Sequence, residues 1–311
     1  MLAVSPFSNP QEKLFVSPNR RGILAIVSGT AAFSANDTIV KIVAREYPLG
    51  EVLAVRGIMT TALVGTILLS LGHFTHLPLA VNRLVLMRSV LEALAALTFT
   101  SALLHMRLAD LSTIIMISPL VITAFAVLFL RETVGWRRWT AISVGFVGAL
   151  FIIKPTPAAF DAWALLGVLC ACISATRDLL TRRLPHGIPS IIVSFMSALT
   201  VTIAGFLLGF WEEWRPLGSR EIGLLAIGAG FLAAGNFLVV LAFRGVDMAA
   251  VAPFRYAILL WASILGFTVF GEIPDRWSAV GALFIVGSGV YAIHRERVRG
   301  REIASGASPS Q

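Results

Sequence analysis

Acidic and basic residues stand inside long apolar runs of this sequence, where an ionisable group is costly unless it has a partner or a function. Asp37 and Lys41 are four residues apart, and so are Arg88 and Glu92. On a helix this spacing places two side chains on one face, so that opposite charges can pair. Each pair is therefore either a structural clamp or part of a site that binds a charged ligand.

Other embedded charges lack an obvious partner nearby. Arg177 and Asp178 are adjacent, so their side chains point in different directions on a helix, and we expect each to find a partner on another helix or in a ligand. Arg255 follows Pro253 by two residues, and a proline interrupts the helical hydrogen-bond ladder and exposes backbone carbonyls. With Arg56, these residues are candidates for a substrate site.

The embedded charges are predominantly basic. They comprise Lys41, Arg56, Arg88, Arg177 and Arg255 against Asp37, Glu92 and Asp178. Five positive minus three negative charges give +2, which favours a substrate with a carboxylate, a phosphate or an electron-rich ring. The three carboxylates would also permit coupling to protons.

Uncharged residues add to this candidate site. Tyr256 and Trp261 stand in the same run as Arg255, where a ring could stack on a substrate, although core packing explains them equally well. Asn236 stands in an apolar run beside Gly235, so its amide needs a partner on a neighbouring helix or in the substrate.

Two acidic residues follow long apolar runs and lie in turns. They are Glu132 and Glu272, which are 140 residues apart. We interpret them mainly as turn and helix-packing residues, with gating as the alternative. Asp37 and Lys41 are further candidates for coupling or gating, although Lys41 is also placed to extend its ammonium group to the lipid headgroups.

The composition is that of a membrane protein. Of 311 residues, 57% are hydrophobic and 14% are charged, whereas a soluble domain carries about 25% charged residues. The formal net charge of +8 is distributed in short clusters between apolar runs, which indicates orientation in a membrane rather than nucleic-acid binding. Cys170 and Cys172 have the spacing of neither a zinc site nor a redox pair.

The apolar runs predict an all-α integral membrane protein, because a helix of ~20 residues crosses the ~30 Å apolar core of a bilayer. They are too long and too uniformly apolar for the alternating strands of ~10 residues in a membrane barrel. Ten transmembrane helices are predicted, at 23–43, 52–72, 82–103, 109–130, 139–154, 163–182, 188–210, 221–242, 248–270 and 276–293.

Lysine and arginine residues between these helices predict the orientation of the chain. With the N-terminus placed inside, the inner segments carry fourteen of them and the outer segments six. Because cytoplasmic loops are enriched in these residues, we expect both termini in the cytoplasm.

The chain consists of two copies of one unit. Asp37 and Lys41 recur as Asp178 and Arg182, each 141 residues later. Each copy holds five predicted helices, and an odd number inverts the second copy, as in many secondary transporters whose substrate site lies between the repeats. The predicted organisation is a cytoplasmic tail (1–21), two repeats (22–155 and 162–295) and a disordered cytoplasmic tail (296–311).

Several short motifs occur at characteristic places in the two units. The first unit has Ala32-Phe33-Ser34-Ala35-Asn36-Asp37 with Lys41, Arg56-Gly57, Arg88 with Glu92, and Pro119 followed by Leu130-Arg131-Glu132. The second has Ala252-Pro253-Phe254-Arg255-Tyr256 and Phe270-Gly271-Glu272-Ile273-Pro274. Together they resemble the EamA family of the drug/metabolite transporter superfamily, and its riboflavin and S-adenosylmethionine uptake carriers in particular.

The resemblance implies ten helices, a central cavity lined by both halves, and alternating access. It leaves the substrate open, because the family includes amino-acid exporters, vitamin and nucleotide-derivative importers and sugar-linked carriers. We expect a secondary active transporter of the inner, cytoplasmic membrane that takes up riboflavin or a similar anionic or aromatic metabolite. Export of amino acids or related metabolites is the alternative. The expected partners are this small molecule and the lipid bilayer, with no nucleic acid, metal ion or cofactor, for a monomer or homodimer.

Three other classes of membrane protein fit the sequence less well. An enzyme would need clustered acid–base or metal-binding residues, yet the five histidines lie in loops or at helix ends without ligand spacing. A channel would need a repeated filter sequence or a ring of charge. A small-multidrug-type efflux pump would favour cationic drugs and a glutamate in the first helix, where this chain has Asp37 with Lys41.

Overall fold

The structure is a computed structural model that describes residues 18–130, 136–153, 162–185, 187–242 and 251–304, and in these ranges it contains helices and no strand. The first half holds α1 (Pro18–Ala44), α2 (Leu49–Ser70), the 3₁₀ helix η2 (His73–Val81), α3 (Arg83–His105), α4 (Leu108–Ile115), α5 (Ser118–Leu130) and α6 (Trp136–Ile153). The second half holds α7 (Ala162–Arg182), α8 (Ser190–Gly209), α9 (Ser219–Ala242), the 3₁₀ helix η3 (Ala252–Tyr256), α11 (Ala257–Phe270) and α12 (Arg276–Ala304).

Within the described ranges, six helices are long and apolar enough to cross a membrane, namely α1, α2, α3, α7, α8 and α9. Three shorter apolar stretches accompany them, at Leu108–Ile122, Ile142–Ile152 and Phe254–Phe270. The prediction of an all-α, multi-pass membrane protein is therefore confirmed.

Two of the predicted helices depart from a regular α-helix near a proline. The run predicted at 109–130 is divided into α4 and α5, because Pro119 has no N–H to donate to the carbonyl of Ile115. The hydroxyl of Ser118 donates to that carbonyl instead, at 2.6 Å. In the second half, the described part of the run predicted at 248–270 begins with η3, which contains a proline in its first turn, and continues as α11. The first half therefore contains a discontinuous helix, whereas the 3₁₀ helix of the second half continues directly into α11.

The C-terminal helix is longer than expected. α12 continues to Ala304, past the predicted helix end at residue 293 and into the segment predicted to be disordered. The prediction relied on apolarity, which marks the part of a helix that lies in the membrane and not the point at which the helix ends. Arginine and glutamate, which dominate the extension, are good helix formers.

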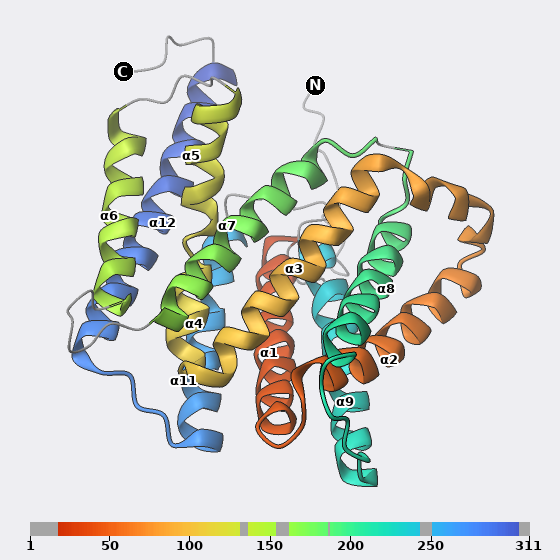
Figure 1. Ribbon diagram of the computed structural model, residues 1–311. Helices are drawn as coiled ribbons and strands as arrows, with labels where there is room; N and C mark the ends of the chain where they lie inside the picture. Colours follow the sequence, from red (N-terminus) through yellow and green to blue (C-terminus); the bar gives the residue numbers. More distant parts are fainter. Residues whose placement is uncertain (1–17, 131–135, 154–161, 186, 243–250, 305–311) are drawn as a thin grey trace, which may run out of the picture.

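The two halves interlock. α1 packs on α9, α3 on α7, α2 on α8 and α6 on α12, so each of these extensive contacts joins one half to the other. Figure 1 shows α6 and α12 side by side at one edge of the molecule, and α2 and α8 toward the opposite edge. The pattern is reciprocal: the first helix of each half packs on the third of the other, and the second packs on the second. A twofold relation between the halves produces this reciprocity.

The two halves approach closely where α6 crosses α12 and where α2 crosses α8. A Cβ atom at Gly148 would lie 2.8 Å from the carbonyl oxygen of Gly281, and one at Gly281 would lie 2.5 Å from that of Gly148. α6 and α12 therefore approach so closely that no side chain fits between them. The hydroxyls of Thr61 in α2 and Thr202 in α8, residues 141 positions apart, lie 3.1 Å from each other.

Replacing Gly281 with alanine is expected to lower the free energy of unfolding by roughly 1–3 kcal/mol, because the added methyl group must force two backbones apart. Gly287→Ala in the same helix is the matched control, since nothing lies within 4 Å of a Cβ atom at that position. Thermal unfolding of both variants in detergent measures the difference. Equal unfolding midpoints would show that close contact between α6 and α12 does not stabilise the protein.

Candidate functional site

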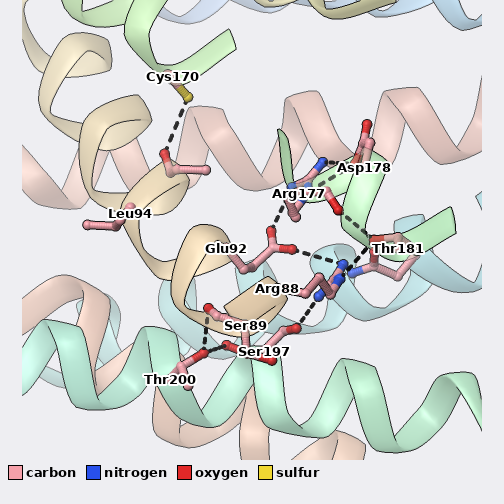
Figure 2. A network of polar contacts seen from close by, with 12 residues as sticks. Arg88, Ser89, Glu92, Leu94, Cys170, Arg177, Asp178, Thr181, Ser197 and Thr200 are labelled. Carbon is pink, nitrogen blue, oxygen red and sulfur yellow. Dashed lines mark hydrogen bonds and ion pairs between the residues drawn. The ribbon is translucent and has the colours of Figure 1, made fainter. Parts of the chain in front are cut away.

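A network of charged side chains links α3 and α7 (Figure 2). Glu92 of α3 pairs with Arg88 on its own helix at 3.1 Å and with Arg177 of α7 at 3.0 Å. Arg177 also pairs with Asp178, at 2.8 Å. The four side chains are between 16% and 29% exposed, so the network is mostly enclosed by helices but is not fully buried.

Hydroxyl groups extend this network to α8. The guanidinium of Arg88 donates a hydrogen bond to Ser197 of α8 and another, from Nε, to Thr181 of α7 at 3.3 Å. Thr200 of α8 donates to the backbone carbonyl of Ser89 at 2.9 Å. Arg88 therefore contacts side chains from three helices, as Figure 2 shows.

The structure confirms one predicted pair and contradicts the interpretation of another. Arg88 and Glu92 share a helix face and pair as expected. The side chains of Arg177 and Asp178 do not diverge, however, because Nε and Nη2 of Arg177 both donate to Oδ1 of Asp178, at 3.0 and 2.8 Å. The long, flexible stem of arginine spans the angle between adjacent helix positions, so the directions of the Cα–Cβ bonds do not decide the contact.

A second polar cluster lies between α1 and α2. Nη1 of Arg56 donates to Oδ1 of Asn36 at 3.0 Å, and Nδ2 of Asn36 donates to Oδ1 of Asp37 at 3.0 Å. Arg56 is buried, and its Nε atom has no hydrogen-bond partner in the described part of the chain. Asn36 was not among the predicted site residues, but the repeat offset identifies it, because it occupies the position that Arg177 holds in the second half.

Asp37 and Lys41 do not form the predicted pair. Nζ of Lys41 lies 2.5 Å from Oε1 of Glu272 and donates to the backbone carbonyl of Met106 at 2.6 Å. Only 2% of the Lys41 side chain is exposed, so it does not extend toward the headgroups. Glu132, the counterpart of Glu272 in the first half, lies outside the described residues.

The predicted residues of α9 and α11 are not brought to the charged network. Asn236 is exposed, and its amide donates to the carbonyl of Leu232 in its own helix at 3.0 Å. Nε1 of Trp261 donates to the carbonyl of Val27 in α1 at 3.1 Å, which makes Trp261 a link between the halves. Neither residue has a polar contact with the network in the described ranges.

The 3₁₀ helix η3 presents two predicted residues in different settings. Arg255 is exposed, and no described residue forms a hydrogen bond or ion pair with it. Tyr256 is half-buried and packs against Gly289 of α12, where a Cβ atom would collide with its ring. Its hydroxyl has no hydrogen-bond partner among the described residues.

We expect Glu92→Gln and Arg177→Gln each to destabilise the protein, because each removes one of the two ionic partners of an embedded charge. The double variant should lose less than the sum of the single variants by roughly 0.5–3 kcal/mol, since the two residues share one interaction. Thermal unfolding of the four proteins in detergent measures this coupling. Arg215→Gln, combined with Glu92→Gln, is the control for a distant pair, and additive losses in the Glu92–Arg177 cycle would contradict the network.

Comparison with known protein families gives a match in each half of the chain. The profile of the EamA-like transporter family matches residues 20–154 and again residues 161–293. A crystal structure that is 18% identical superposes with a TM-score of 0.59 and covers 88% of this chain and 98% of its own. At this identity the superposition shows a shared fold.

Individual relatives include carriers described as uptake and as export proteins. The S-adenosylmethionine uptake transporter of Rickettsia bellii is 31% identical over 179 residues, which is 58% of this chain and 61% of that protein. The riboflavin transporter of Vibrio cholerae is 33% identical over 190 residues, or 60% of this chain and 63% of that protein. The pseudopaline exporter of Pseudomonas aeruginosa is 28% identical over 276 residues, or 86% and 94%. The chain therefore spans less than two thirds of the first two carriers and nearly all of the third.

Proposed function

This chain is a member of the EamA-like transporter family, and from that premise we propose that it is a secondary active carrier of a small metabolite in the inner, cytoplasmic membrane. In this proposal, ten helices form two inverted five-helix repeats with both termini in the cytoplasm, and the substrate crosses by alternating access. The interlocked helices, the discontinuous helix of the first half and the excess of basic residues in the inner segments support it.

Arg255 carries the proposal for the chemical class of the substrate. The charges of Arg88, Glu92, Arg177 and Asp178 cancel within one network, and Lys41 is neutralised by Glu272. Arg56 is bridged to Asp37 through Asn36. Arg255 is then the embedded arginine that the described residues leave without an acidic partner.

An exposed guanidinium without a partner binds a carboxylate or phosphate, or stacks on an aromatic ring. Arg255 lies on the 3₁₀ helix η3, which continues directly into α11, and secondary carriers place their substrate beside irregular helical segments of this kind. We therefore propose riboflavin or a similar anionic or aromatic metabolite as the substrate, with Tyr256 beside the anchoring arginine.

In the same proposal, the charged network of α3 and α7 takes part in the transport cycle. Its arginines hold carboxylates while the carrier is empty, and they exchange these partners for the acidic or electron-rich part of the substrate. Glu92 and Asp178 then orient the arginines or accept protons. Partial exposure of all four side chains supports this exchange.

Export of amino acids or related metabolites is the second candidate. One observation favours it: the alignment with the pseudopaline exporter covers 94% of that protein, whereas the alignments with the S-adenosylmethionine uptake transporter and the riboflavin transporter cover 61% and 63% of theirs. Direction of transport therefore has to be measured together with the substrate.

Uptake of labelled riboflavin, S-adenosylmethionine and aromatic amino acids should be measured in cells that lack their own carriers. We expect saturable accumulation of one compound, and a loss of at least about tenfold in Arg255→Ala at the same membrane level, because a charge-assisted hydrogen bond contributes roughly 1.5–3 kcal/mol. Arg255→Lys should retain part of the activity. Arg220→Ala removes another exposed arginine, at the start of α9, and serves as the control.

The possible results separate the two candidates. Normal uptake by Arg255→Ala at a normal membrane level would remove Arg255 from the substrate site. Faster loss of a compound from preloaded cells, without uptake, would support export. Absence of transport in both directions for every compound would count against these substrates.

A further inference from the structure

A set of ionic contacts joins the two halves at one end of the molecule. The α1–α2 turn, the corner between α3 and α4 and the connection between α11 and α12 all lie at the lower end of the view in Figure 1. Side chains from these three connections or from the adjoining helix ends meet there. None of these contacts belongs to the substrate site proposed above.

The first contact is built around Glu272, which follows α11. Its Oε1 atom pairs with Nζ of Lys41 in α1 at 2.5 Å, and its Oε2 atom accepts a hydrogen bond from the backbone N–H of Leu108 at 2.9 Å. Leu108 is the first residue of α4, so Glu272 satisfies a free N–H at a helix N-terminus, where negative charge is favourable. One carboxylate thus connects α1 and α4 of the first half to α11 of the second.

The second contact is built around Arg107, at the corner between α3 and α4. Its Nη2 atom pairs with Oδ2 of Asp275 at 2.8 Å, and its Nη1 atom donates to the carbonyl of Ile273 at 2.8 Å. Its Nε atom pairs with Asp110 of α4 at 2.6 Å. Burial alone would lower the pKa of Arg107, but the hydrogen bond to Asp275 and the charge of Asp110 raise it, so Arg107 stays charged.

Asp275 has a second role in the same contact. Its other oxygen, Oδ1, accepts hydrogen bonds from the N–H groups of Trp277 and Ser278 at 3.0 and 2.9 Å, which caps the N-terminus of α12. Arg107 therefore holds the beginning of α12 against the α3–α4 corner. Nζ of Lys41 lies over the ring of Phe270, 5.0 Å from the ring centre.

These contacts are made by side chains and can open without unfolding a helix. Among the described residues, no backbone–backbone hydrogen bond joins the α11–α12 connection to the α3–α4 corner. Glu272, Arg107 and Asp275 are 15%, 29% and 34% exposed, so water can replace their partners when the corners separate. The cost of breaking each pair is then partly offset by hydration.

We propose that Lys41 with Glu272 and Arg107 with Asp275 form the outer gate of the carrier, and that this structure shows the gate closed. The outer placement rests on the proposed function, because the three connections belong to the segments that the topology places outside the cell. Beneath the gate, Leu108 of α4 and Ala262 of α11 are fully buried. The helices α4 and α11 are therefore packed at these two positions while the contacts hold.

The test uses a reporter cysteine below the gate. The two native cysteines, Cys170 and Cys172, are first replaced with alanine. Ala262→Cys is then introduced as the reporter. Ala262 lies one helical turn before Gly266, and a Cβ atom at Gly266 would lie 3.3 Å from Oε2 of Glu272. Intact cells are then treated with a membrane-impermeant maleimide, and the rate of labelling is measured. With the gate intact we expect slow labelling.

Two variants open the gate in different ways. Lys41→Met with Glu272→Gln neutralises both members of one pair, so that no lone buried charge remains. Asp275→Asn removes the charge that holds Arg107 but retains an N-cap residue for α12. We expect each to raise the labelling rate by about tenfold, the change that corresponds to about 1.4 kcal/mol in the opening equilibrium. If one variant fails to insert, the other still decides the outcome.

Arg276→Gln is the matched control. Arg276 follows Asp275 in sequence and is exposed, and its described contact is with the ring of the adjacent Trp277, at 5.6 Å. The Arg276→Gln variant removes a charge beside the gate without breaking a contact between the halves, so the rate of cysteine labelling should not change.

Unchanged labelling in inserted gate variants would overturn the proposal. Labelling that rises only from the cytoplasmic side, in inverted vesicles, would overturn the outer placement. The labelling rate can be measured without knowing the substrate. A failure of the gate proposal can therefore be distinguished from a failure of the proposed transport function.

Discussion

Pairing of charges across the two halves is the constraint on which the rest of the structure depends. A charge among apolar helices is costly without a partner or a function, and removal of one partner weakens the compensation of the other. In this protein Glu92 with Arg177, Lys41 with Glu272 and Arg107 with Asp275 each join the first half to the second. The ion pairs therefore set how the halves fit together, in addition to any role in transport.

The sequence was sufficient to predict the membrane class, the repeat and the pair of Arg88 with Glu92, because apolar length and the four-residue spacing are local properties. It was insufficient for Lys41, whose partner is 231 residues away, although Asp37 stands at the favourable spacing. Helical spacing shows which residues can meet, but tertiary packing decides between a local and a distant partner. The pairing of Arg177 with Asp178 was missed for another reason, since the reach of the arginine side chain outweighs the direction in which it leaves the helix.

The two halves share an architecture but not a chemistry. α1 and α2 carry Asn36 and Arg56 at the positions where α7 and α8 carry Arg177 and Ser197, 141 residues later in each case. As a result, the first cluster has one guanidinium held by an amide, whereas the second has two guanidiniums held by carboxylates. Repeat symmetry identifies where the polar clusters lie. Because equivalent positions of the two repeats carry different residues, the two clusters are suited to different roles.

The contacts between the halves fall into two kinds that behave differently in the proposed transport cycle. Thr61 with Thr202 joins equivalent positions, so an exchange of conformation between inverted repeats leaves this contact in place. The ion pair of Lys41 with Glu272 joins non-equivalent positions, so the same exchange must break it. A contact between equivalent residues at the axis and hydratable ion pairs away from it are what a rocking motion requires, because the axis has to hold while the ends separate.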